Sequence, residues 1–374
     1  FAGLKPPEAR ALAQSLAAAR DAELEADLRG AFALRAPRNV LALSGGDASG
    51  AFGCGVLAGW RFAPGATQRP KFDIVTGVST GALMGTFAFL GEAQDDQVLR
   101  EVYTQTRDAD IYTGPLTPGA PDSVFDTAPL GRLIAKYATD AVIERVAAAH
   151  REGRRLYVAT VGLTEGRLVI WPLSRIAADA FAAEHRSSGS GRAGFDRFRR
   201  ILLAAAAIPV VFPPVELDGD LHADAGLHAA IFLRRAMLGF ESGPEIAQHH
   251  PDDNQSPTVY AILNGRLRVD PRVTADDLFH IGTRSLDLYM DGLQFASLRA
   301  VAQIAVSHQP PFEFRYTSAP PALSLRDEEA PNPLKSMFDL VRMSKLYAAG
   351  EVLGRLGPAA WNQGLPPDDG EAGR

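Results

Sequence analysis

The chain lacks the features of a disulfide-rich protein and of a membrane-spanning protein. Its 374 residues include one cysteine, Cys54, which excludes an internal disulfide and a cysteine-rich metal site. No apolar run reaches the roughly 18–20 residues that a membrane-spanning helix needs. The best candidate, residues 201–215, is interrupted by Pro209, Pro213 and Pro214. We therefore expect neither a disulfide scaffold nor a spanning helix.

The chain also lacks an excess of positive charge. Its 38 Lys and Arg residues face 44 Asp and Glu residues, for a formal net charge of −6. A nucleic-acid-binding protein would show a basic stripe, so we expect no nucleic-acid partner. The apolar content of 46% and the charged content of 22% are ordinary for a globular protein. With no internal repeat and no clear domain boundary, we predict a single α/β domain over residues 1–374.

Alternating strand and helix patterns predict a parallel sheet. Residues 40–43 and 72–75 are short apolar runs typical of buried strands, and helical stretches follow them at 50–60 and 79–90. This order implies right-handed crossovers between parallel strands. We expect further strands at 156–163, 168–172, 210–215, 221–223, 258–263 and 312–316. Further helices are expected at 7–29 and 195–207. The C-terminal part, residues 275–374, is expected to contain helices at 275–307 and 335–355 and a Pro/Gly-rich tail.

Residues 77–81 (GVSTG) form a G-x-S-x-G motif between the second predicted strand and its helix. This is the context of a nucleophile elbow, in which a tight turn presents the serine. Gly77 and Gly81 leave room beside Ser79, and the helix points its positive end at the reacting centre. The motif alone also fits an ordinary turn whose serine caps the helix.

Two further segments carry polar groups beside predicted strands. The turn at residues 44–50 (SGGDASG) fits a phosphate cradle, an oxyanion hole or a plain glycine turn. It lacks the Lys-Ser/Thr ending of a P-loop and the full dinucleotide fingerprint. Asp224 follows a strand-like segment, and a carboxylate held within reach of a serine can act as its base. By itself, an aspartate before Ala-Gly is more often a turn residue.

Taken together, these motifs resemble the patatin-like phospholipase family. Four blocks agree with the family in order and approximate spacing, and the resemblance spans residues 38–235. The blocks are residues 44–57, 77–81, 205–215 and 224–226. The resemblance implies a three-layer α/β/α sandwich with a mainly parallel sheet, and hydrolysis of lipid acyl esters without a metal or other cofactor.

The resemblance also implies roles for individual residues. Ser79 would attack the ester carbonyl, and Asp224 would take the serine proton and later activate water. The backbone amides around Gly45, Gly46 and Asp47 would hold the oxyanion. The substrate would be a lipid or another carboxylic ester.

Three positions depart from the family pattern. Asp47 stands where a third glycine is usual, and we expect its carboxylate to point away from the oxyanion. Ser49 stands where the family often has Arg or Lys, and Ala225 replaces a glycine. Because the basic residue is missing, we expect a preference for uncharged or short-to-medium acyl esters over intact phospholipids.

Other functions remain open at this level. A Ser–His–Asp carboxylesterase of the α/β-hydrolase kind would place its histidine after the acid. Its candidates are His228, His249, His250, His280 and His308. His222, two residues before Asp224, is a candidate accessory base, although a structural role is commoner for such a histidine. A non-catalytic lipid- or partner-binding protein on the same fold is a second alternative, and acyl transfer would use the same acyl-enzyme.

Residues 108–129 are the candidate lid. This stretch is rich in Pro, Gly, Asp and Thr, and it carries Ile111, Tyr112, Leu116 and Phe125. Those side chains either form an interfacial lid with peripheral membrane contact or tuck into the core, and the second arrangement is the commoner one. The first residue, Phe1, is compatible with a removed leader, so export or a membrane-peripheral location is slightly favoured over the cytoplasm.

Overall fold

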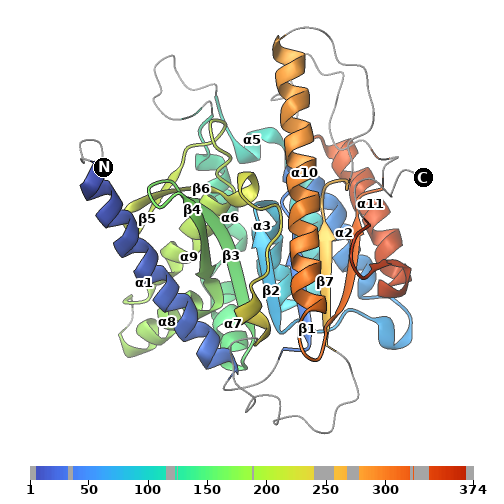
Figure 1. Cartoon of the computed structure of the whole chain (residues 1–374), viewed down its shortest axis with the longest axis horizontal. Helices are drawn as coiled ribbons and strands as arrows, with labels where there is room; N and C mark the ends of the chain where they lie inside the picture. The colour runs from blue at the N-terminus through green and yellow to red at the C-terminus, as the bar shows by residue number, and fades with distance from the viewer. Residues whose placement is uncertain are drawn as a thin grey trace.

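A mixed, mostly parallel sheet lies between two layers of helices (Figure 1). The computed structural model describes residues 6–32, 37–114, 123, 125–187, 189–239, 257–267, 278–320, 323 and 337–367. The strands are β1 (Asn39–Leu43), β2 (Ile74–Val78), β3 (Arg155–Gly162), β4 (Arg167–Pro172), β5 (Val215–Leu217), β6 (Asp220–Asp224), β7 (Thr258–Leu263), β8 (Glu313–Ser318) and β9 (Asn362–Gln363). The helices are α1 (Pro6–Phe32), α2 (Gly50–Trp60), α3 (Thr80–Leu90), α4 (Ala93–Gln105), α5 (Asp108–Ile111), α6 (Ala128–Tyr137), α7 (Asp140–Arg151), α8 (Leu173–Arg186), α9 (Arg192–Ala205), α10 (Leu278–Val306) and α11 (Leu340–Leu356).

The strand order is β5-β6-β3-β2-β1-β7-β8-β9, with β4 paired to β3. The centre of the sheet is parallel, because β3, β2, β1, β7 and β8 pair in that sense. Strands β4, β5, β6 and β9 are antiparallel to their neighbours. The fold class predicted from the resemblance, a three-layer sandwich with a mainly parallel sheet, is confirmed.

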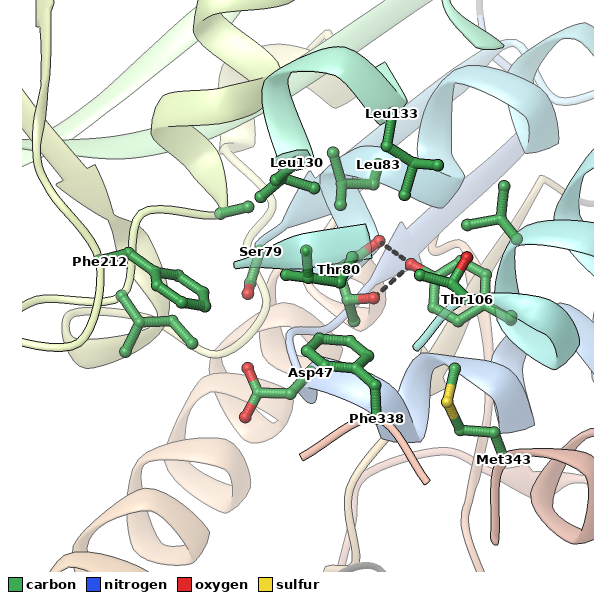
Figure 2. A pocket seen from close by; sticks show the side chains of 15 residues that line it. Asp47, Ser79, Thr80, Leu83, Thr106, Leu130, Leu133, Phe212, Phe338 and Met343 are labelled. Carbon is green, nitrogen blue, oxygen red and sulfur yellow. Dashed lines mark hydrogen bonds between the residues drawn. The ribbon is translucent and has the colours of Figure 1, made fainter. Parts of the chain in front are cut away.

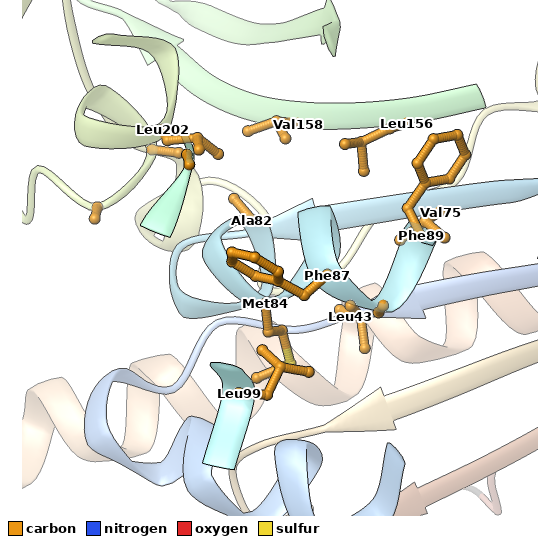
Figure 3. Close-up of a cluster of buried hydrophobic side chains, with 14 of the residues drawn as sticks. Leu43, Val75, Ala82, Met84, Phe87, Phe89, Leu99, Leu156, Val158 and Leu202 are labelled. Atoms are coloured by element: carbon orange, nitrogen blue, oxygen red, sulfur yellow. The ribbon is translucent and has the colours of Figure 1, made fainter. Parts of the chain in front are cut away.

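Both faces of the central strands are buried, which explains their continuous apolar sequences. In β1, Leu41 and Leu43 face one apolar cluster while Val40 and Ala42 face the other. Helix α3 lies wholly in the first cluster, against the sheet (Figure 3). Helix α10 lies along the opposite face and contributes Leu298 to the second cluster. The core therefore consists of two layers, one on each side of the sheet.

The strand predicted at residues 210–215 is wrong for all but its last residue. Strand β5 begins at Val215, and Val210 lies in a turn with a φ of 71°. Pro209, just before this segment, and Pro213 and Pro214 within it have no N–H to donate to a sheet, and the chain turns there instead. None of the helices in the described parts of the chain is long and apolar enough to cross a membrane.

Candidate active site

Ser79 occupies a strained turn between β2 and α3. Its φ of 54° and ψ of −127° lie outside the regions that ordinary residues favour, and such a conformation costs on the order of 1–3 kcal/mol. A Cβ on Gly77 would lie 2.3 Å from the Gly81 carbonyl oxygen, and one on Gly81 would lie 2.5 Å from the Leu43 oxygen. Both glycines of the motif are therefore required by close backbone contact. The turn has the geometry of a nucleophile elbow.

Strand register brings Asp224 to this turn. Strand β2 pairs with β3 up to Val78, which lies opposite Ala159, and β6 pairs with the next residue of β3 through Asp224. Strand β4 occupies the other edge of β3, so β2 and β6 must follow one another along the same edge. The end of β6 therefore lies beside the residue that follows β2. That residue is Ser79, whose hydroxyl is close enough to the Asp224 carboxyl group to act on its pKa.

The Asp224 carboxyl group is held in a dry environment. Its side chain accepts the Gly226 N–H at 2.7 Å, and the residue is only 4% exposed. Burial raises the pKa of Asp224 from 3.8, the ordinary value of an aspartate, to about 7. The Ser79 hydroxyl and the hydrogen bond from the Gly226 N–H act in the opposite direction, while the charge of Asp47 raises the pKa further. A carboxyl group with this pKa can accept and return a proton near neutral pH.

The glycine-rich turn lies against Ser79. A Cβ on Gly45 would lie 3.3 Å from the Ser79 Cβ, so the backbone there approaches the serine closely. The Gly45 N–H donates to the Ala230 carbonyl at 3.0 Å, which commits that donor within the fold. Gly46 and Asp47 follow, with φ values of 145° and 49°. Of the three residues predicted to hold an oxyanion, Gly45 therefore has its N–H already bonded, and the prediction is left with the N–H groups of Gly46 and Asp47.

Asp47 faces the site more directly than the sequence predicts. It lines the same cavity as Ser79 (Figure 2). Its carboxylate is near enough to Asp224 to raise the pKa of that group. Asp47 therefore affects the protonation state of its neighbour, a role that the glycine of the usual family pattern does not have.

Asn264 is a site residue that the sequence reasoning missed. It follows β7, and its Nδ2 donates to the Ser44 carbonyl at 2.7 Å while its Oδ1 accepts the Gly53 N–H at 3.1 Å. Its own N–H donates to Ser44 Oγ at 2.9 Å, and the side chain is fully buried. Asn264 therefore ties the start of the glycine-rich turn to helix α2, which follows the turn. The sequence feature that could have revealed Asn264 is the Asn-Gly pair at the carboxyl end of a predicted parallel strand.

The candidate accessory residue His222 makes structural contacts. Its Nδ1 lies 2.9 Å from Thr160 Oγ1, and its ring packs edge-on against Trp171. Burial and, to a lesser extent, the charge of Arg20 lower its pKa to about 4, so the imidazole is neutral at physiological pH.

The other candidate histidines are distributed over the fold. His228 is exposed. The ring nitrogens of His308 lie 2.7 Å and 2.6 Å from the carbonyl oxygens of Pro310 and Leu238. His249 and His250 lie outside the described residues, as does the side chain of His280.

The residues proposed for a lid are mostly buried. Ile111, Tyr112 and Phe125 are 6–8% exposed, and the ring of Tyr112 packs against the rings of Phe125 and Phe212. Leu116 lies outside the described residues. The described part of this stretch therefore joins the core.

A narrow apolar cavity of about 60 Å³ opens at Ser79. Figure 2 shows Ser79 and Phe212 at one side of the view, with Thr106 and Met343 at the other. The apolar side chains along it include Leu83, Leu130, Leu133, Phe212, Phe338 and Met343. Such a lining suits a hydrocarbon chain better than a charged group.

An α/β/α sandwich with a strained serine turn after a parallel strand is typical of serine-dependent hydrolytic enzymes. The patatin-like phospholipase family model matches residues 41–237, a little over half of the 374 residues. The chain therefore belongs to the patatin-like phospholipase family, a family of lipid acyl hydrolases. The resemblance predicted over residues 38–235 is confirmed at nearly the same bounds.

Among solved structures, the chain is similar to VipD from Legionella pneumophila. The sequence identity is 10% and the TM-score is 0.42, over 87% of this chain and 68% of that chain. No curated protein matches the chain.

Proposed function

We propose that the protein hydrolyses carboxylic esters through a serine–aspartate dyad, with Ser79 as nucleophile and Asp224 as base. The observation that carries this proposal is that the strand register brings the Ser79 hydroxyl, in its strained turn, beside a buried carboxyl group with a pKa near 7. The family's lipid acyl hydrolase activity supports an acyl ester as substrate.

In the first half of the proposed reaction, Ser79 Oγ attacks the ester carbonyl carbon and its proton passes to Asp224. The backbone amides of Gly46 and Asp47 hold the resulting oxyanion, and the N-terminal end of α3 favours the negative charge. The tetrahedral intermediate then collapses. The C–O bond to the alcohol breaks, the alcohol takes the proton from Asp224, and the acyl group remains on Ser79.

In the second half, Asp224 takes a proton from water, and the resulting hydroxide attacks the acyl-enzyme. Collapse of this second intermediate returns the proton to Ser79 and releases the carboxylic acid. An alcohol in place of water would give acyl transfer through the same intermediate. The two steps in which Asp224 takes a proton, from Ser79 and from water, require it to be ionised at the start.

Fluorophosphonate labelling with peptide mapping tests the nucleophile. We expect one covalent adduct on Ser79, because the probe needs both an activated serine and a working oxyanion site. The same treatment of Ser79→Ala should leave the protein unmodified. A folded wild-type protein that takes no label would instead favour a binding function, and an adduct on a different serine would refute the assignment of Ser79.

The pH dependence of kcat/KM tests the base. Because the ionised carboxylate is the active form, kcat/KM should fall about tenfold per pH unit below the pKa of Asp224 and level off above it, with an inflection near pH 7. Asp47→Asn should move the inflection to lower pH, because it removes the nearby charge that raises this pKa. Asparagine also tolerates the positive φ at this position. A profile that is flat between pH 5 and 9 would contradict the role of Asp224.

A Ser–His–Asp mechanism makes a different prediction about histidine. His228→Ala and His308→Ala should each retain most of the wild-type kcat/KM if the dyad is correct. Loss of turnover in one of these variants, with its thermal unfolding unchanged, would support a triad instead.

A further inference from the structure

We infer that Phe338 and Met343 close the acyl-binding cavity and restrict the enzyme to esters of short acyl chains. This inference rests on the proposed function, because it assumes that the acyl group is transferred to Ser79. Both residues lie outside the segment 41–237 that matches the family model. The wall that limits the acyl chain would thus be specific to this protein's C-terminal region.

The cavity is small for a lipid-binding site. Its volume is about 60 Å³, well below that of an apolar cavity of roughly 150 Å³ that binds benzene. The space beside Ser79 is accordingly better suited to a short acyl chain than to a long one. A longer chain would have to displace the side chains that form the wall.

Local contacts fix the position of this wall. The Phe338 N–H donates to Asp108 Oδ1 at 2.8 Å, which ties the segment before α11 to α5. Asp339 caps α11 by accepting the Arg342 N–H at 2.7 Å. One turn further on, Met343 is 1% exposed. Phe338 and Met343 therefore line the cavity from the first turn of α11 and the residues before it. The bond to Asp108 and the Asp339 cap hold this segment in place.

Helix α11 cannot shift easily, because it packs directly on the backbone of α2. A Cβ on Gly55 would lie 2.0 Å from the Tyr347 carbonyl oxygen, and one on Gly350 would lie 2.1 Å from the Phe52 oxygen. Helix α2 continues from the glycine-rich turn beside Ser79. The wall and the reacting centre are thus coupled through one rigid helix pair, so the depth of the cavity is built into the fold.

Acyl-length profiles of Met343→Ala and Phe338→Ala test this inference. The assay is hydrolysis of p-nitrophenyl acetate, butyrate and octanoate, with Ser79→Ala as the background. The wild-type enzyme should favour acetate and butyrate. Each truncation should raise the octanoate-to-butyrate ratio of kcat/KM by about tenfold or more, because each accommodated methylene group is worth about 10–200-fold in an apolar pocket. Met343→Phe should instead lower butyrate turnover relative to acetate.

Leu346→Ala is the matched control. Leu346 lies on the same helix and is also 1% exposed, but it does not line the cavity. This variant should lose thermal stability without a change in the octanoate-to-butyrate ratio. If Met343→Ala does not fold, Phe338→Ala decides the matter, because Phe338 is only partly buried.

The outcomes separate the two proposals. Unchanged ratios in folded variants, with turnover that still depends on Ser79, would overturn the role of Phe338 and Met343 and leave the proposed function intact. A wild-type preference for octanoate would also overturn it. Absence of any Ser79-dependent turnover in the wild-type protein would overturn the proposed function and the acyl-length inference together.

Discussion

Replacing Ser79 with alanine should lower kcat/KM for ester substrates by about a thousandfold or more, because loss of the nucleophile removes the covalent pathway. The fold should survive. Alanine meets about the same conformational cost as serine at a φ of 54°. The substitution removes one hydroxyl group and leaves the close backbone contacts of Gly77 and Gly81 in place. Steady-state kinetics and thermal unfolding should be measured on the same preparation.

Ser174→Ala provides the comparison for this substitution. Ser174 is a fully buried serine in α8 that accepts the Leu156 N–H at 3.1 Å. Its removal should lower the melting temperature while leaving most of the activity. If Ser79→Ala kept more than a few per cent of wild-type turnover, another group would have to be the nucleophile.

Replacing Asp224 with asparagine should lower kcat/KM by about 10²–10⁴-fold, the usual contribution of a positioned general base. Asparagine has nearly the same shape, and its oxygen can still accept the Gly226 N–H. The amide cannot take the proton of Ser79, so the hydroxyl stays a poor nucleophile. Kinetics at pH 8 provide the clearest measurement, because wild-type Asp224 is then mostly ionised.

The same substitution should stabilise the folded protein at pH 8. The pKa of Asp224 is about 7 in the folded state and near 3.8 in the unfolded chain, so the wild-type protein loses stability as the pH rises between these values. The full loss is on the order of 4 kcal/mol. Asparagine carries no charge, so the variant does not undergo this loss of stability. Asp224→Asn should therefore have a higher melting temperature than wild type at pH 8, and little advantage at pH 4.

Asp220→Asn is the matched control, because Asp220 is a buried aspartate on the same strand. Its carboxylate accepts the backbone N–H groups of Thr164 and Leu221, so its replacement should reduce stability and leave most of the activity. An active Asp224→Asn enzyme would rule out Asp224 as the base. If Asp224→Asn is inactive and shows no thermal unfolding transition, it has not folded. Asp224→Ser should then be used to test the role of Asp224 as the base.

Much of the candidate site could be predicted from local sequence. Residues 77–81 combine a buried strand, two glycines and a helix start, and the structure places Ser79 in the expected strained turn. The glycine-rich turn could be found for the same reason, since its glycines allow a backbone path that few other residues permit. These features depend on neighbours in the chain, so short-range patterns are enough to reveal them.

The positions of Asp224, Asn264 and Met343 relative to Ser79 could not be obtained in that way. Asp224 reaches the serine only because β6 follows β2 along one edge of β3. Asn264 reaches the glycine-rich turn because β7 pairs with β1. Met343 reaches the cavity because α11 packs on the backbone of α2.

The sequence by itself determined the chemistry that the site can contain: a serine in a tight turn, a glycine-rich loop and a carboxylate after a strand. Tertiary structure decided which of these groups meet, how dry the carboxylate is and where the cavity ends. The physical reason is that the apolar pattern of a segment reports which of its side chains are buried. Which strand edges pair and which helices touch depends on packing among segments far apart in the chain.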